Sequence, residues 1–104
     1  MFKRIYIIKD TTSGAYSEAP IVESSDASFI RSFGYALVQQ GLPKRFCHDL
    51  QAVCIGELVD DGRSVYPSLK AYSTPVPICT GFEALCKYIE EYSEEDGIIE
   101  TPEV

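Results

Sequence analysis

Apolar residues between Ser24 and Gly41 recur every three or four positions, which is the spacing of one face of an α-helix. Ser24 or Ser25 can cap the free N–H groups at the start of this helix, and Gly41 followed by Pro43 is typical of its end. We therefore predict an amphipathic helix in this stretch. Its buried stripe is predicted to contain Phe29, Ile30, Phe33, Ala36, Leu37 and Gln40.

A second stripe of the same period predicts a helix over Thr80–Tyr92. Thr80 and Glu83 have the spacing of a capping box, in which each side chain accepts an N–H group at the start of the helix. A helix of this length is unstable alone, so we expect it to dock on its own sheet or on a second copy of the protein. The stripe consists of Phe82, Leu85, Cys86 and Ile89.

Runs rich in β-branched and aromatic residues predict the strands. Turn residues separate them at 10–14 and 60–63, and Pro20 and Pro67 favour edge positions, because proline lacks a ladder donor. Residues 70–79 contain Pro75 and Pro77 and are predicted to be an extended connector. The predicted strands cover residues 2–9, 15–22, 51–59 and 64–69.

The predicted order of elements is β-β-α-β-β-α, which defines an α+β domain. We expect one mostly antiparallel, four-stranded sheet with both helices packed on one face, because this arrangement buries both apolar stripes. The length of 104 residues fits one domain, predicted to span residues 1–92. Residues 93–104 are predicted to be an acidic, flexible tail.

The net charge of −7 argues against a simple nucleic-acid-binding surface, which needs a basic footprint. The charge is unevenly distributed, since the acidic tail contributes −5 and residues 1–92 contribute only −2. The first 45 residues are slightly basic. An acidic tail can shield a basic face from nucleic acid, but such a tail is more often a solvated end.

No window approaches 18 apolar residues, so we predict no membrane span. The first apolar run ends at Lys9 and Asp10 without a small-residue cleavage site, which is typical of a strand and not of a signal peptide. A cytoplasmic location is the resulting expectation. The four cysteines form two C-x6-C pairs instead of the C-x2-C spacing of zinc sites, so neither metal nor cofactor is predicted. Cys54 and Cys86 are expected to face the core.

The sequence contains no recognisable catalytic constellation, and we predict a protein that is not an enzyme. Cys47, His48 and Asp49 are the only neighbouring nucleophile, base and acid, but adjacent side chains rarely converge. The seven tyrosines are too many for the core of a small domain. They fit three alternatives: stacking on single-stranded bases, a protein interface, or cross-strand packing.

Arg31 interrupts the apolar stripe of the first predicted helix. It lies about 100° from Ile30 around the helix and therefore borders the stripe. We expect its methylene stem to be buried and its guanidinium to pair with a carboxylate at the sheet margin, such as Asp10, Asp49 or the Asp60–Asp61 turn. A phosphate contact is the competing interpretation.

Several short motifs occur in a particular order: a strand that ends in aspartate, a helix with an isoleucine–arginine pair and a phenylalanine, and an acidic hairpin turn. The motif residues are Asp10, Ile30, Arg31, Phe33, Asp49, Gly56 and Gly62. In their order and spacing, these motifs resemble the small nonstructural protein family of gokushovirus-type microviruses, which are small single-stranded DNA phages. The resemblance covers about residues 3–66, and residues 68–104 show no matching pattern.

The resemblance implies a nonstructural phage protein in the host cytoplasm that acts around single-stranded DNA replication or genome packaging. It would bind viral DNA or the phage replication and procapsid proteins. The residues expected to contact DNA are Lys3, Arg4, Lys9, Lys44 and Arg45 for phosphates and Tyr6 for base stacking. The alternative is a protein-interaction module, directed at a host or phage protein, that has no nucleic-acid role. A homodimer through the Thr80–Tyr92 helix is a further expectation.

Overall fold

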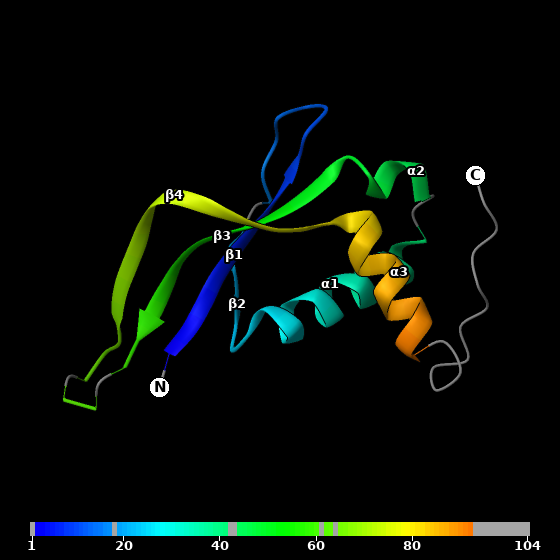
Figure 1. The fold of residues 1–104 in the computed structure, drawn as a ribbon. Helices are drawn as coiled ribbons and strands as arrows, with labels where there is room; N and C mark the ends of the chain where they lie inside the picture. Colours follow the sequence, from blue (N-terminus) through cyan, green and yellow to red (C-terminus); the bar gives the residue numbers. More distant parts are fainter. Residues whose placement is uncertain (1, 18, 42–43, 61, 64, 93–104) are drawn as a thin grey trace.

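The computed structural model describes residues 2–17, 19–41, 44–60, 62–63 and 65–92. The predicted β-β-α-β-β-α order and the α+β class are confirmed, with one additional short helix before the third strand (Figure 1). The predicted tail, residues 93–104, lies outside the described residues. The elements are β1 (Phe2–Asp10), β2 (Ile21–Glu23), α1 (Asp26–Gln40), α2 (Lys44–Cys47), β3 (Leu50–Val59), β4 (Ser68–Thr80) and α3 (Gly81–Tyr92).

The four strands form one antiparallel sheet in the order β2-β1-β3-β4. Tyr6 of β1 lies opposite Cys54 of β3, while the preceding Ile5 lies opposite Gly56, so β3 carries a one-residue bulge at Ile55. The bulge keeps the alternation of β1 intact. As a result, Arg4, Tyr6 and Ile8 face one side of the sheet and their odd-numbered neighbours face the other side.

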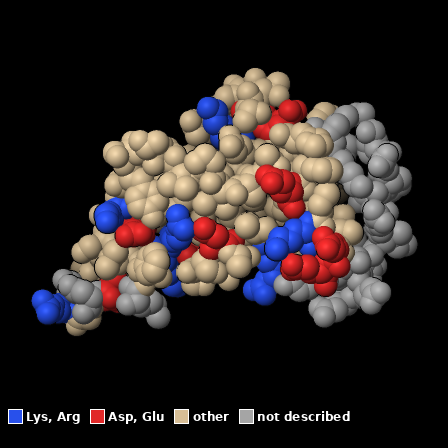
Figure 2. Space-filling model, viewed as in Figure 1, with Lys and Arg blue, Asp and Glu red and all other residues tan. Residues whose placement is uncertain are grey.

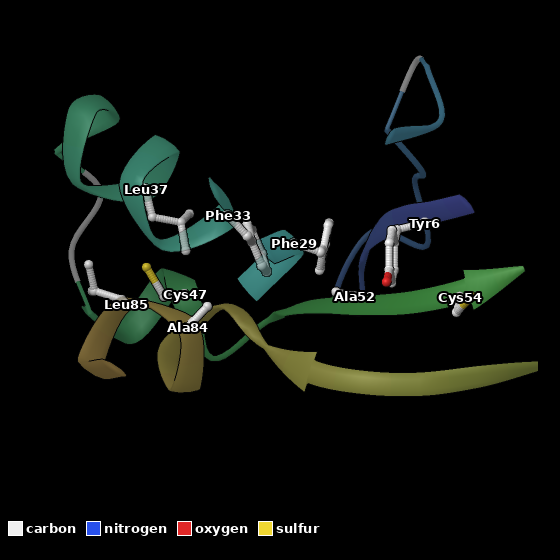
Figure 3. Close-up of a cluster of buried hydrophobic side chains, with 9 residues drawn as sticks. All are labelled: Tyr6, Phe29, Phe33, Leu37, Cys47, Ala52, Cys54, Ala84 and Leu85. Carbon is white, nitrogen blue, oxygen red and sulfur yellow. The ribbon is translucent and has the colours of Figure 1, made fainter. Parts of the chain in front are cut away.

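Both long helices cover the same face of the sheet, as predicted (Figure 1). The Tyr6 ring stacks on Phe29 of α1 with ring centroids 4.1 Å apart, and Phe33 and Leu37 continue the contact along the helix. Figure 3 shows how this single core joins the sheet and the helices. The buried cluster consists of Tyr6, Phe29, Phe33, Leu37, Cys47, Ala52, Cys54, Ala84 and Leu85.

The predicted ends of α1 are confirmed. The Ser25 side chain accepts the N–H of Ser28, which satisfies a free donor of the first turn. Gly41 adopts a left-handed φ of 67°, and its N–H closes the helix on the carbonyls of Leu37 and Val38.

The capping box of α3 is also confirmed. The Thr80 N–H donates to Glu83 Oε1 over 2.8 Å, and the Glu83 N–H donates to Thr80 Oγ1 over 3.1 Å. The helix docks on its own chain, with Ala84, Leu85 and Tyr88 buried. A dimer through the Thr80–Tyr92 helix remains a prediction, but of the apolar stripe it would use, Leu85 is buried within the chain and Phe82, Cys86 and Ile89 are partly buried.

The expected connector at 70–79 is wrong, because these residues belong to the 13-residue strand β4. Pro75 and Pro77 are tolerated there because β4 lies at the sheet edge and its register shifts nearby. The strand predicted at 64–69 is largely absent, since β4 begins only at Ser68. The strand predicted at 15–22 is reduced to an isolated Lys9–Tyr16 bridge and the three residues of β2.

Candidate functional site

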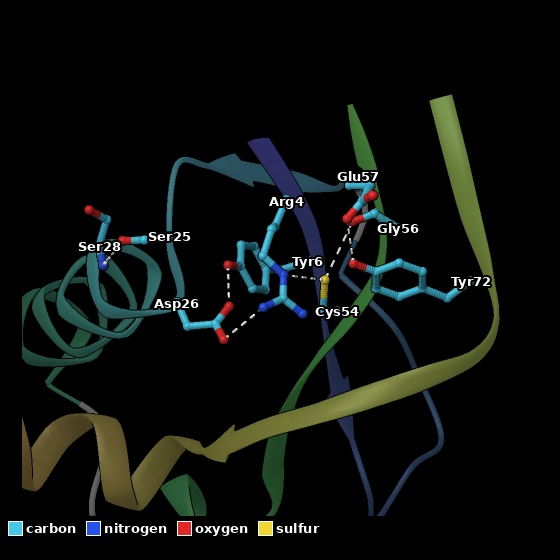
Figure 4. A network of polar contacts seen from close by, with 9 residues as sticks. All are labelled: Arg4, Tyr6, Ser25, Asp26, Ser28, Cys54, Gly56, Glu57 and Tyr72. Carbon is cyan, nitrogen blue, oxygen red and sulfur yellow. Dashed lines mark hydrogen bonds and ion pairs between the residues drawn. The ribbon is translucent and has the colours of Figure 1, made fainter. Parts of the chain in front are cut away.

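A polar network joins β1 to the first turn of α1 (Figure 4). The Tyr6 hydroxyl donates to Asp26 Oδ1 over 2.6 Å, and Arg4 Nη1 lies 2.9 Å from Asp26 Oδ2. Asp26 is the first residue of α1, where the helix dipole also favours a negative charge. One carboxylate therefore fixes where the helix starts relative to the sheet.

The network continues across the sheet to β3 and β4. Arg4 Nε lies 3.3 Å from the Cys54 sulfur, and that thiol lies 3.4 Å from the Gly56 carbonyl. On the neighbouring strand, the Tyr72 hydroxyl donates to Glu57 Oε2 over 2.9 Å. These contacts occupy the helix-facing side of the sheet beside the start of α1 (Figure 4).

The contacts in this network raise the pKa values of Arg4, Tyr6 and Tyr72, so all three side chains hold the protons that they donate. Burial, followed by the hydrogen bond to Asp26, raises the pKa of Tyr6. The hydrogen bond to Cys54 raises the pKa of Arg4, and the bond to Glu57 raises the pKa of Tyr72. Both tyrosines therefore stay protonated donors and Arg4 stays charged at neutral pH. The network acts as a structural clamp, with its polar atoms directed at one another.

The opposite face of the sheet carries a second candidate site. No described element covers it (Figure 1). Strand pairing places Ile5 beside Val22, Ile7 beside Val53, and Lys3 beside Leu58 on this face. Leu69 extends it onto β4 and is 67% exposed, while Val22 at the other edge is 44% exposed. We call these residues the open face, defined as Lys3, Ile5, Ile7, Lys9, Val22, Gln51, Val53, Leu58, Leu69, Ala71 and Pro77.

The residues predicted to bind DNA do not form one surface. Lys3 and Lys9 lie on the open face about 20 Å apart along β1, at either end of its aliphatic centre. Arg4 and Tyr6 lie on the helix-covered face and are bound to Asp26. The prediction that Tyr6 stacks on bases is wrong in this structure, because its ring is fully buried against Phe29.

The remaining predicted phosphate contacts, Lys44 and Arg45, belong to the short helix α2, and their side chains lie outside the description. Lys9 lies 5.4 Å from the centre of the Tyr16 ring, which the sequence did not indicate. Figure 2 shows basic and acidic side chains interspersed on the face in view, without a single basic patch.

Asp10 and Asp49, two of the motif residues, stabilise the end of the sheet where β1 leads into its turn and β3 begins. Asp10 Oδ1 accepts the N–H of Thr12 over 2.9 Å, which stabilises the predicted turn after β1. The Asp49 carbonyl accepts the N–H of Thr11 over 2.7 Å and its hydroxyl over 2.9 Å. The role of both residues in the structure is therefore to hold the turn against the start of β3.

The two motif glycines are explained by backbone geometry. Gly62 has φ 77°, which favours glycine, and its N–H donates to Asp60 Oδ1. At Gly56 an added Cβ would lie 2.6 Å from the Lys70 carbonyl oxygen, so β3 and β4 approach too closely for a side chain. The apolar motif residues Ile30 and Phe33 pack in or against the core.

The predicted ion pair of Arg31 is not found among the described residues, and Asp61, one of its predicted partners, lies outside them. Its side chain is exposed on α1, and none of the described carboxylates, including Asp10, Asp49 and Asp60, pairs with it. Arg31 instead lines a cleft between α1 and α3. Sequence periodicity placed the residue at the border of the stripe but could not show that α3 lies beside it.

Comparison with family models, curated proteins and solved structures finds no match to this chain. Among the described helices, none combines the length and apolar character needed to cross a bilayer. Over the same described residues, no group of three or more histidine, cysteine and acidic side chains is placed to hold a metal ion. The geometry above is therefore what supports a functional proposal.

Proposed function

We propose that this chain is a non-enzymatic accessory protein of a single-stranded DNA phage that binds another protein through its open face. The single observation that carries the binding proposal is the uncovered aliphatic side of the sheet. A half-buried antiparallel sheet ordinarily presents polar residues to water on its outer side. Here the centre of that side consists of the half-buried Ile7 and Val53 and of Ile5, which its neighbours leave only 8% exposed.

The arrangement of this face fits a protein interface. Such interfaces combine an apolar centre with a polar rim, and the open face has lysines at both ends of β1 around an aliphatic middle. Single-stranded nucleic acid is a poorer fit, because stacking requires aromatic rings in the centre of the sheet. Two exposed rings lie at its margins: Tyr16 beside Lys9, and Phe2, which lines a pocket with Lys3 and Leu58.

The resemblance of residues 3–66 to the microvirus nonstructural family supports the phage assignment. It favours a partner among the replication or procapsid proteins and a location in the host cytoplasm. The alternative within the same mechanism is a host protein as partner. In either case the protein acts by presenting a surface, with no bond-making step assigned to its residues.

Site-specific photo-crosslinking in phage-infected cells tests this proposal. A benzophenone amino acid replaces Leu69 on the open face or, as a control, the exposed Glu90 on α3. We expect a crosslink from position 69, but not from position 90, to a phage replication or procapsid protein. The additional change Val22→Lys, at the far edge of the same face, should weaken that crosslink.

Equal crosslinking from both positions would overturn the proposal, because it would show that the partner does not bind specifically at the open face. Crosslinks from position 69 to nucleic acid would also overturn it. Circular dichroism of each variant checks that the sheet is intact; both positions are exposed, so little loss of stability is expected.

A further inference from the structure

The open face is positively charged, although the chain as a whole is acidic. The chain has sixteen acidic and nine basic residues, yet the charged members of the open face are Lys3 and Lys9. Within the described part of the chain, neither lysine forms an ion pair with a carboxylate. Two unpaired cations on an aliphatic surface favour a partner that brings negative charge.

Each of the two lysines lines a cavity that also has apolar walls. At one end of β1, Lys3 and Leu58 line a cavity of about 330 Å³. At the other end, Lys9 and Val53 line a cavity of about 360 Å³. Asp60 also lines the first cavity, so the positive charge is least opposed at the Lys9 end. Each cavity can take an aliphatic side chain whose neighbouring carboxylate pairs with the lysine.

The distance between the lysines sets the length of the element that can reach both. Lys3 and Lys9 are about 20 Å apart at the rise of a strand. A helix rises about 1.5 Å per residue, so about 13 helical residues span this distance. Four strands are together about 15 Å wide, which leaves room for one helix about 10 Å across.

A helix suits this face better than an extended segment does. A strand laid flat on aliphatic side chains leaves its own N–H and C=O groups without partners, whereas a helix pairs these groups internally. Extended segments are instead added at sheet edges. Both edges are poorly suited here, because β2 has three residues and β4 contains Pro75 and Pro77 next to shifts in its register.

We propose that the open face binds one amphipathic helix of the partner protein, which lies along β1 with its aliphatic stripe on Ile7 and Val53 and with acidic residues near both ends that pair with Lys3 and Lys9. This inference rests on the proposed function, which assigns a protein partner to the open face but does not say what the partner presents. The bound helix adds a third layer, so that the sheet lies between helices on both of its faces.

Crosslinks from the two ends of the open face test the helix. A benzophenone amino acid replaces Leu69, which pairs with Leu58 at the Lys3 end, or Gln51, which lies opposite Lys9. Mass spectrometry then locates the crosslinked residues in the phage replication or procapsid protein. We expect both crosslinks in one segment, about 13 residues apart and each within about one helical turn of an acidic residue.

The separation of the two crosslinks distinguishes failure of the helix from failure of the proposed function. A separation of about six residues would show an extended segment and overturn the helix. Crosslinks to two different elements, or to a segment without acidic residues, would also overturn it. In each of these cases the proposed function survives, because a phage protein is still crosslinked. No crosslink to any phage protein from either position would remove both proposals.

Matched charge reversals test the role of the lysines. Lys9→Glu should lower the yield of the crosslink from position 69 about fivefold, because it places a carboxylate against an acidic end of the helix. Lys9→Arg keeps the charge and should leave the yield unchanged. The control Arg31→Glu makes the same charge reversal at an exposed position of α1, away from the open face.

Equal loss of the crosslink in Lys9→Glu and Arg31→Glu would overturn the acidic helix, since it would show that only net charge matters. An unchanged yield in Lys9→Glu would overturn it as well. Circular dichroism confirms that each variant is folded before its crosslinks are compared; both changes are at the surface, so little loss of stability is expected.

Discussion

The Asp26 carboxylate links two side chains of β1 to the start of α1. It accepts the Tyr6 hydroxyl, pairs with Arg4 and lies at the positive end of the α1 dipole. The Tyr6 hydroxyl has no access to water, so its hydrogen bond decides whether burying the ring is favourable. The stacking of Tyr6 on Phe29 and the polar clamp are therefore interdependent.

Replacement of Asp26 by alanine should lower the free energy of unfolding by about 2 kcal/mol, because it leaves a buried hydroxyl without an acceptor. Tyr6→Phe removes the donor instead and should cost about 1 kcal/mol, since Asp26 keeps its pair with Arg4. Urea denaturation at pH 7 measures both values. A loss below about 0.5 kcal/mol for Asp26→Ala would contradict the clamp.

Burial of Cys79 makes the stability of the fold decrease at alkaline pH. Burial raises the pKa of the Cys79 thiol to about 11, from 9.0. Between these values the unfolded chain loses a proton that the folded chain retains, so stability is complete below pH 9 and falls as pH rises towards 11. The burial that raises the pKa of Tyr6 acts in the same direction.

We therefore expect the melting temperature to fall above pH 9 and the fall to be shallower in Cys79→Ala. Thermal unfolding followed by circular dichroism at several pH values measures this slope. The Cys79 thiol should also react with iodoacetamide more slowly than free cysteine at pH 8, as read by mass spectrometry. Reaction at the rate of free cysteine would show that the thiol is not protected.

At the scale of elements, the contact between α1 and α3 depends on a residue without a side chain. An ideal Cβ at Gly34 would lie 2.5 Å from the Ala84 carbonyl oxygen and 2.6 Å from Tyr88 Cβ. The absent side chain lets the two helices meet at backbone distance, which also brings Lys87 towards Arg31 across the cleft. Glycine in a helix costs about 1 kcal/mol relative to alanine, so its presence here serves packing.

The change Gly34→Ala should destabilise the protein by about 1–3 kcal/mol, because overpacking outweighs the gain in helix propensity. The matched control is Gln39→Ala at an exposed position of α1, which should change stability by less than about 0.5 kcal/mol. Urea denaturation compares the two. Stabilisation by Gly34→Ala would show that the helices are free to separate.

The elements that the sequence predicted well are those set by local chemistry. The capping box of Thr80 and Glu83 and the Gly41 stop act within a few residues, so they can be read from the chain. The strand β4 could not be predicted from local sequence. Its prolines are tolerated because β4 lies at the sheet edge and pairs on one side only, with β3, which is a property of the whole sheet. The cleft between α1 and α3 could not be predicted either, since it requires two helices that are distant in sequence.

At the scale of the whole molecule, the sheet extends beyond the layer of helices (Figure 1). The core lies where Tyr6, Ala52 and Cys54 meet α1, whereas Leu69 and the other first residues of β4 are exposed. The helical pattern of the sequence correctly implied that one face would be covered. It could not indicate how much of the sheet the helices would cover, because that depends on the twist of the sheet and the crossing of the helices.

This uneven cover predicts a gradient of local stability along β3. Amides paired with β1 near Tyr6 and Cys54 should exchange with solvent only on global unfolding, because opening them exposes the core. Amides of the Leu58–Leu69 pair should exchange by local opening, since few buried contacts hold them. Hydrogen exchange of the free protein followed by NMR measures both groups. Slow exchange at Leu58 in the free protein would mean that something already covers this end of the open face, and binding of the proposed partner should produce that same protection.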